Sequence, residues 1–184
     1  MAKLVSKTYG DALFELAVDE GKEDILLEEA EGIKALLNEN NEFVKMMNHP
    51  QISREEKESV IENVFKGRVS DDMTGLLKLL VTNGRFSDVM SVIDYFIAEI
   101  KDYKKIGIAY VATPLELSDE QKSDVEKKLL ETTEYEKIEI VYSIDESLIG
   151  GMTIRIKDRV IDSSVKSKLA KITKELKQIK LAQA

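Results

Sequence analysis

The chain of 184 residues contains no cysteine, no tryptophan, two prolines and a single histidine. The lack of cysteine excludes disulfide bonds, thiolate ligands for zinc or iron–sulfur clusters, and cysteine nucleophiles. The one histidine, His49, stands before Pro50 in an expected loop, with no second histidine to share a metal ion. A role for His49 as a general base stays open beside a simple loop role. Much of the usual chemistry of enzymes is therefore missing.

Long hydrophobic runs are also missing, because no segment approaches the roughly 20 apolar residues of a transmembrane helix. The first residues enter an amphipathic pattern directly, so we expect no signal peptide and a bacterial-type cytoplasmic location. Hydrophobic residues make up 43% and charged residues 34% of the chain, which is typical of a soluble globular protein. The net charge of −8 argues against non-specific binding to nucleic acid or anionic lipid, unless basic residues gather in one place.

The first hundred residues repeat apolar side chains at the spacing of amphipathic helices. Ser53 and Glu56 form a capping-box motif before the fourth of these segments. Asp71 or Asp72 is predicted to cap the fifth. The sequence therefore predicts an all-α domain of six helices over residues 1–104.

Near Lys104 and Lys105 the spacing of apolar residues changes from 3.6 to 2, which marks a domain boundary. Ser118 and Gln121 form a second capping box before another amphipathic segment. A polar tip separates the last two expected strands. Residues 105–184 are therefore predicted to form a small α/β domain of order β-α-β-β-β-α, which makes the whole chain α+β.

Gly150-Gly151 is the one glycine pair, and glycine-rich loops can bind phosphate. The pair lies between strand-like segments, where a bulge or sharp bend is the usual explanation. Asp145, Asp158 and Asp162 bring carboxylates near the predicted hairpin and raise the possibility of a cation or acid–base site. Aspartate is also favoured at turns for its own backbone hydrogen bonds. A small phosphate- or metal-dependent enzyme therefore remains one alternative.

The last predicted helix carries six lysines against one acidic residue, Glu175. Such a helix can meet nucleic acid, although it has no aromatic residue for base stacking. A solvated face and docking on an acidic protein partner explain the lysines equally well. An RNA-binding module is therefore the second alternative. The apolar residues of this helix follow the four-and-three spacing of a packing seam.

The fifth predicted helix is apolar on more than one side through Leu76, Leu77, Leu79, Leu80 and Val81. A helix of this kind either lies at the centre of its bundle or shares a groove with a ligand helix. Both interpretations stay open at this point.

Two groups of residues form a pattern that extends over essentially the whole chain. The more specific group is Asp145, Leu148, Ile149-Gly150-Gly151, Ile154, Val160-Ile161-Asp162, Ser164-Val165 and Leu169. The second group is Tyr9 with Ala12-Leu13, His49-Pro50-Gln51-Ile52 with Lys57, and Leu80 with Asn83-Gly84-Arg85. Together they resemble the ATP synthase delta subunit family, the bacterial counterpart of the mitochondrial oligomycin-sensitivity-conferring protein. Gly10 departs from the family pattern, which often has alanine there.

The resemblance implies a non-catalytic stator subunit of a proton-translocating ATP synthase, without a cofactor or metal of its own. It implies that residues 1–104 hold the amino-terminal helix of an alpha subunit on the catalytic head. Residues 105–184 would bind the b subunits of the peripheral stalk. One copy per complex would lie at the cytoplasmic face of a bacterial cell membrane, peripheral through the complex, with neither membrane insertion nor a nucleic-acid partner.

The resemblance also implies particular contact residues. Those implied for the alpha-subunit helix are Tyr9, Leu13, Leu16, Leu76, Leu77 and Leu80. Those implied for the b subunits are Val165, Leu169, Ile172, Leu176 and Ile179. Gly150 and Gly151 would shape the second domain without contacting a ligand.

Overall fold

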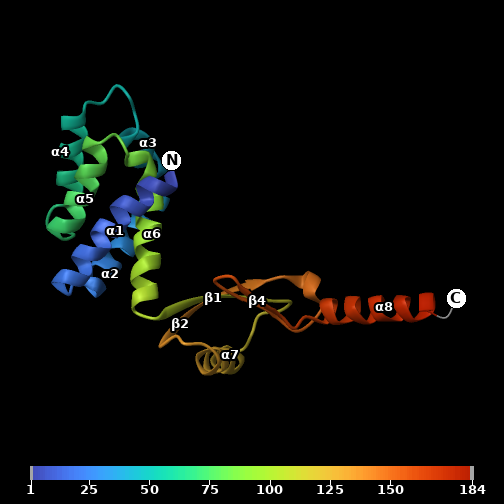
Figure 1. Cartoon of the computed structure of the whole chain (residues 1–184). Coiled ribbons are helices and arrows are strands. Elements are labelled where there is room, and N and C mark those ends of the chain that lie inside the picture. Colours follow the sequence, from blue (N-terminus) through green and yellow to red (C-terminus); the bar gives the residue numbers. More distant parts are fainter. Residues whose placement is uncertain (1, 183–184) are drawn as a thin grey trace. The chain divides into compact units, whose positions relative to one another are not determined.

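The computed structural model describes residues 2–182 and divides the chain into two compact units, Met1–Tyr103 and Lys104–Ala184 (Figure 1). The division falls one residue before the boundary expected from the sequence. Unit 1 is helical and unit 2 is a small α/β unit, so the predicted α+β class and the predicted order of elements are confirmed. Among residues 2–182 no helix has the length and apolar character needed to cross a membrane.

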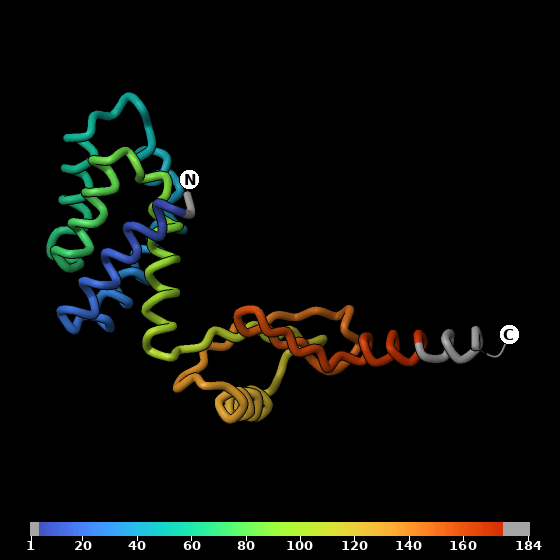
Figure 2. The backbone as a smooth tube through the Cα atoms, in the orientation of Figure 1, coloured from blue at the N-terminus to red at the C-terminus, as the bar shows by residue number. Residues whose placement is uncertain are grey.

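Unit 1 contains six α-helices and one short 3-10 helix around a shared apolar core. The elements are α1 (Ala2–Glu20), α2 (Glu23–Glu39), α3 (Asn41–Met47), α4 (Arg54–Phe65), α5 (Asp71–Thr82), η1 (Phe86–Asp88) and α6 (Val89–Tyr103). Helix α6 packs mainly on α1 and α2, and α4 packs on α5. Figure 2 shows the chain passing from α6 directly into the first strand of unit 2.

The start of α4 is capped as predicted, but the start of α5 is not. The Ser53 hydroxyl accepts from the Glu56 amide, and the Ser53 amide donates to the Glu56 carboxylate. At α5 the cap is Ser70, because its backbone is extended and its hydroxyl accepts from Met73 N. Ser70 N and Oγ also donate to the Glu29 carboxylate, at 2.7 and 2.6 Å, which holds the cap against α2. The prediction of Asp71 or Asp72 as the cap is therefore wrong.

As far as residue 182, unit 2 contains a four-stranded sheet, two α-helices and a 3-10 helix. The elements are β1 (Ile106–Thr113), α7 (Asp119–Thr132), β2 (Lys137–Ile144), η2 (Glu146–Leu148), β3 (Thr153–Ile156), β4 (Arg159–Asp162) and α8 (Val165–Ala182). The strand order is β2-β1-β3-β4, with β1 and β2 parallel and β3 and β4 forming an antiparallel hairpin. The capping box of Ser118 and Gln121 begins α7 as predicted.

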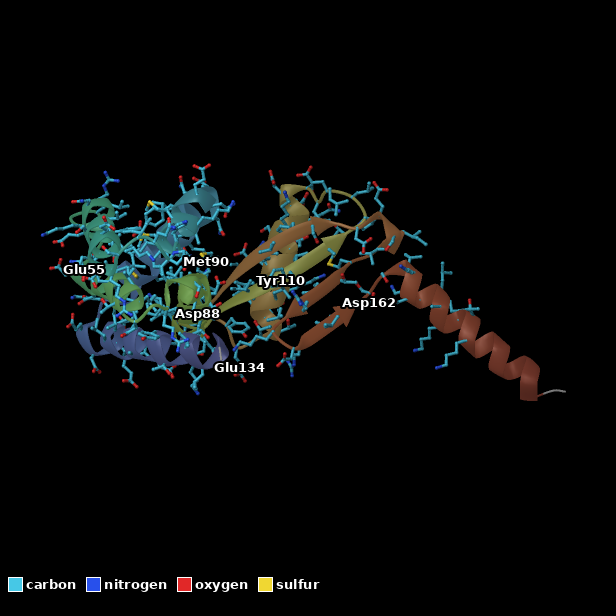
Figure 3. All side chains as sticks on the ribbon, turned by 90° about the horizontal axis from the view of Figure 1, so that it is seen from above. Glu55, Asp88, Met90, Tyr110, Glu134 and Asp162 are labelled. Carbon is cyan, nitrogen blue, oxygen red and sulfur yellow. The ribbon has the colours of Figure 1, made fainter. Side chains whose placement is uncertain are left out.

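The two faces of this sheet differ in their surroundings. Ala109 and Val111 of β1 are buried with Val125 and Leu129 of α7 in the core of unit 2. On the opposite face Tyr110 is exposed, and the Arg155 guanidinium lies 4.7 Å from the centre of its ring. Figure 3 marks Tyr110 on the sheet and Asp162 at the end of β4, just before α8. The core of unit 2 is therefore one-sided and small.

We predict that Glu62 makes unit 1 sensitive to acid. The Glu62 carboxylate accepts from Lys66 Nζ at 2.7 Å and from Lys78 Nζ at 2.9 Å, and so links α4 to α5. These hydrogen bonds lower the pKa of Glu62 from near 4.5 to about 2, and the one from Lys66 has the largest effect. Because the folded-state pKa is depressed, the stabilisation is present above pH 4.5 and is lost as the pH falls toward 2. Glu62→Gln should therefore reduce the fall in unfolding free energy over this range.

Urea unfolding at several pH values, followed by two-dimensional NMR signals of unit 1, measures this effect. Glu131→Gln removes one exposed carboxylate of α7 in unit 2 and serves as the matched control. At neutral pH the loss should be small, because the Glu62 side chain is partly exposed and solvent screens the ion pairs. An unchanged pH dependence in Glu62→Gln would contradict the prediction.

Candidate partner-binding surfaces

The six residues expected to contact an alpha-subunit helix do not all lie on the surface. Leu77 and Leu80 are fully buried in the core of unit 1, and Leu13 and Leu76 are also buried. Tyr9 and Leu16 are half-buried at the edge of this core. The bundle-core interpretation of α5 therefore accounts for Leu77 and Leu80, and an outward surface must be sought elsewhere on the helix.

The outward side of α5 carries Leu79 and Gly75. The Leu79 side chain is 49% exposed, and a Cβ added to Gly75 would meet no atom within 4 Å. On α1 the exposed Ala12 and the half-buried Leu16 follow the same pattern of small and apolar side chains. Sequence reasoning missed Leu79 as a contact because all leucines of α5 look alike in a hydrophobic pattern. The angular position of Leu79 around the helix differs from that of the buried Met73, Leu77 and Leu80, and this difference places Leu79 on the solvent side of α5.

Two polar contacts join α1 to α5 at opposite ends. Lys22 Nζ, just beyond α1, donates to Asp72 Oδ2 in the first turn of α5 at 2.8 Å. Hydrogen bonds to Asp72 and then Glu20 raise the pKa of Lys22 above its usual value. At the other end Asn83 Nδ2 donates to the Tyr9 hydroxyl at 3.0 Å. These contacts set α1 and α5 antiparallel. Ala12 and Leu16 of α1 and Gly75 and Leu79 of α5 lie in the sequence between the contacting residues, and we call these four residues together with Tyr9 the α1/α5 surface. The buried Leu76 lies beneath this surface, in the core.

Helix α1 is also fixed from its other side, by α6. The Tyr95 hydroxyl donates to Asp11 Oδ1 at 2.8 Å, and this bond together with burial raises the pKa of Tyr95 to about 12. The Tyr95 ring lies so close to Gly10 that a Cβ at Gly10 would overlap its Cδ1. Gly10, which costs some helix stability in isolation, therefore lets α6 hold α1 in place.

In unit 2 the glycine pair lies against residues 163–165, at the start of α8. Gly150 O accepts from Val165 N at 2.9 Å, and a Cβ on Gly150 would lie 2.9 Å from Val165 Cγ2. Gly151 has φ +75°, and a Cβ there would lie 2.5 Å from the backbone oxygen of Ser163. The two glycines therefore make room for a close-packed bend. We call residues 149–151 the IGG turn.

The aspartates near this turn serve as caps. Asp162 accepts from Ser164 N at 2.9 Å and from Ser167 Oγ at 2.5 Å, and these bonds lower its pKa. Asp145 accepts from Ser147 N at 3.0 Å, and hydrogen bonds from Ser147 lower its pKa as well. In the part of the chain that the structure describes, no group of three or more His, Asp or Glu side chains could hold a metal ion. The carboxylates therefore order the start of α8 and the turn before it.

Helix α8 presents an unpartnered apolar stripe at its start. Val165, Leu169 and Ile172 are 37%, 52% and 52% exposed. The side chains of Leu176 and Ile179, which continue the same spacing, lie outside the described residues. Lys168, Lys171 and Lys174 are exposed on the same helix, and Lys166 Nζ donates to Ser147 Oγ at 3.2 Å. We call Val165, Leu169 and Ile172 the α8 stripe.

Comparison with known proteins matches nearly the whole chain to one family. A family model described as "ATP synthase delta (OSCP) subunit" matches residues 5–176. A protein named ATP synthase subunit delta from Lachnoclostridium phytofermentans is 49% identical over 181 residues, which cover 98% of this chain and all of the relative. One of the same name from Clostridium kluyveri is 30% identical and covers 95% of this chain and 96% of its own. A chain from the cryo-EM structure of the Toxoplasma gondii mitochondrial ATP synthase hexamer shares the fold, with a TM-score of 0.76 at 20% identity over 93% of this chain and 96% of that one.

We predict that Gly151→Ala destabilises unit 2 by about 2–4 kcal/mol, because strain at positive φ adds to a clash with fixed backbone. Gly150→Ala should cost about 1 kcal/mol, since the opposing atom belongs to the Val165 side chain, which can shift. Gly84→Ala is the matched control: φ is +63° there, but the added Cβ meets nothing within 4 Å. Urea unfolding followed by NMR gives the three values. Equal losses at Gly84 and Gly151 would show that the close approach to Ser163 does not matter.

Proposed function

The chain belongs to the ATP synthase delta (OSCP) subunit family and is a stator component of an ATP synthase, and on this premise we propose which partners it joins. Unit 1 binds the amino-terminal helix of an alpha subunit of the catalytic head, and unit 2 binds the b subunits of the peripheral stalk. The chain itself is not catalytic. It is present once per complex, at the cytoplasmic face of a bacterial cell membrane, and is held there through the complex.

One observation carries the proposal: each of the two units exposes its own apolar helix surface. In unit 1 this is the α1/α5 surface, and in unit 2 it is the α8 stripe. A subunit that resists the torque on the catalytic head needs one durable contact with the head and another with the stalk. Helix packing against an apolar surface supplies such contacts without an active site. Binding through two joined units also raises the overall affinity above that of either contact alone.

The α1/α5 surface fits an amphipathic helix. Ala12 and Gly75 are small and let a helix backbone approach closely, while Leu16 and Leu79 offer apolar side chains on either side. Tyr9 completes the contact. Leu13, Leu76, Leu77 and Leu80 support it from the core and do not contact the partner. The proposal therefore keeps two of the six residues expected from the resemblance, Tyr9 and Leu16, and adds Ala12, Gly75 and Leu79.

The α8 stripe fits a second helical partner. Val165, Leu169 and Ile172 follow the spacing of a packing seam, which Leu176 and Ile179 continue in the sequence. The exposed lysines around the stripe would border such a contact. The RNA-binding and enzyme alternatives are not favoured, since the family assignment covers nearly the whole chain and Asp145 and Asp162 already serve as caps.

We predict that Leu79→Asp weakens binding of a synthetic alpha-subunit amino-terminal peptide at least tenfold, about 1.4 kcal/mol, because a charge would be buried under the peptide. Leu16→Asp should act in the same direction. Ile25→Asp, at an exposed apolar residue of α2, is the matched control and should leave the affinity unchanged. Fluorescence anisotropy of the labelled peptide measures all three. The proposed alpha-subunit site is wrong if the folded wild-type chain does not bind the peptide. It is also wrong if Ile25→Asp weakens binding as much as Leu79→Asp does.

We predict that Leu169→Asp weakens binding of the soluble part of the b subunits at least tenfold while leaving alpha-peptide binding intact. Ala170→Asp places the same charge on a different side of α8 and serves as the control. Isothermal titration calorimetry with the full chain gives both affinities. If Ala170→Asp weakens binding as much as Leu169→Asp, the stripe is not the contact.

A further inference from the structure

Ile149 has a backbone conformation that is unusual for its side chain. Its φ is +67° and its ψ −37°, although a β-branched residue at positive φ is a genuine outlier. The side chain is also 67% exposed, so little packing within unit 2 compensates for the strain. With ψ at −37°, the residue also lies outside the left-handed helical region, and glycine, which has no Cβ, would adopt this conformation with less strain. The fold alone therefore gives no reason for isoleucine at this position.

The strain is held in place by contacts on both sides of Ile149. Before it, Leu148 is buried, and Ile149 N donates to Glu146 O at 3.2 Å. After it, Gly150 O accepts from Val165 N, and Gly151 lies against the Ser163 backbone. Because both neighbours are anchored, the residue between them cannot relax. Strain that the surroundings maintain in this way is often found where a protein binds a partner.

The position of Ile149 connects it to the α8 stripe. Gly150 touches Val165, the first residue of the stripe, so Ile149 lies beside the start of α8. The ten residues from 165 to 174 contain four lysines and no acidic residue. A partner that packs along this segment therefore needs an apolar stripe for Leu169 and Ile172 and acidic residues on its flanks.

We propose that Ile149 is the anchor residue of this docking surface, and that its partner is an amphipathic helix with acidic flanks which buries the Ile149 side chain. The inference rests on the proposed function, because it assumes that a helix of the peripheral stalk binds along α8. The IGG turn holds the side chain outward before the partner arrives, so binding costs little further ordering. Binding hot spots lie in well-packed, fully desolvated parts of an interface, and a side chain that is fixed in advance reaches such a place at a low cost in entropy.

The test is to remove the strain and the side chain together. Ile149→Gly removes the Cβ and with it the strain at this backbone conformation. Ile149→Asn removes the branch at Cβ and the apolar side chain, so it lowers the strain without the added freedom of glycine. Both variants should leave the urea midpoint of unit 2 unchanged or higher. Both should weaken binding of the soluble b-subunit segment at least tenfold. Ile149→Val keeps a branched apolar side chain and should stay within about threefold of the wild-type chain.

Val141→Ala, at an exposed apolar residue of β2, is the matched control and should bind like the wild-type chain. The charge argument is tested by Lys168→Glu, which should weaken binding, and by added salt, which should weaken wild-type binding in the same direction.

Three outcomes would overturn the inference. If Leu169→Asp loses binding while Ile149→Gly and Ile149→Asn keep it, α8 docks the stalk but Ile149 is not its anchor. If both Ile149 variants lower the urea midpoint of unit 2 along with binding, Ile149 serves the fold. If the folded wild-type chain does not bind the b-subunit segment, the proposed stalk contact fails and this inference fails with it.

Discussion

The close contact between the IGG turn and the start of α8 is the constraint on which unit 2 depends. Helix α8 packs chiefly on η2, and its described side chains are largely exposed, so its attachment comes from the bend and not from a core. Gly151 permits the bend, Val165 N and Gly150 O close it, and Asp162 with Ser164 caps the helix that follows. The same residues carry the specific part of the family pattern, which explains in physical terms why they occur together.

The two units differ in how much they bury. Unit 1 has an extensive core with large side chains such as Leu26, Leu77 and Phe96 fully inside it. Among the described residues of unit 2, six hydrophobic side chains are buried in its core, and α7 covers one face of its sheet. A unit of roughly 80 residues is marginal when it buries little apolar area. A partner that covers the α8 stripe would therefore stabilise unit 2 as well as bind it.

Periodicity and capping motifs predicted the elements, the fold class and their order, because these depend on local spacing that the sequence displays directly. The face of α5 was harder to predict, since its five neighbouring apolar residues fit either side of the helix until its neighbours α1, α2 and α4 are in place. The cap at Ser70 had a local signal, a serine before the first turn, but two aspartates follow it directly and are also favoured cap residues. The contact of Ser70 with Glu29, forty-one residues away, has no local signal. The strain at Ile149 likewise arises from anchors on both sides. What sequence reasoning missed was set by contacts between elements.

The connection between the units has a mechanical consequence. Helix α6 ends at Tyr103 and β1 begins at Ile106, so the linker between them consists of residues 104–105 alone. Helix α6 is lined with buried residues of unit 1, and β1 is an interior strand of the sheet, paired with β2 over its full length. A tensile load along the chain would therefore enter each unit through an enclosed element. In the sheet the load would be shared between two neighbours of β1, because β1 is hydrogen-bonded to β2 on one side and to β3 on the other.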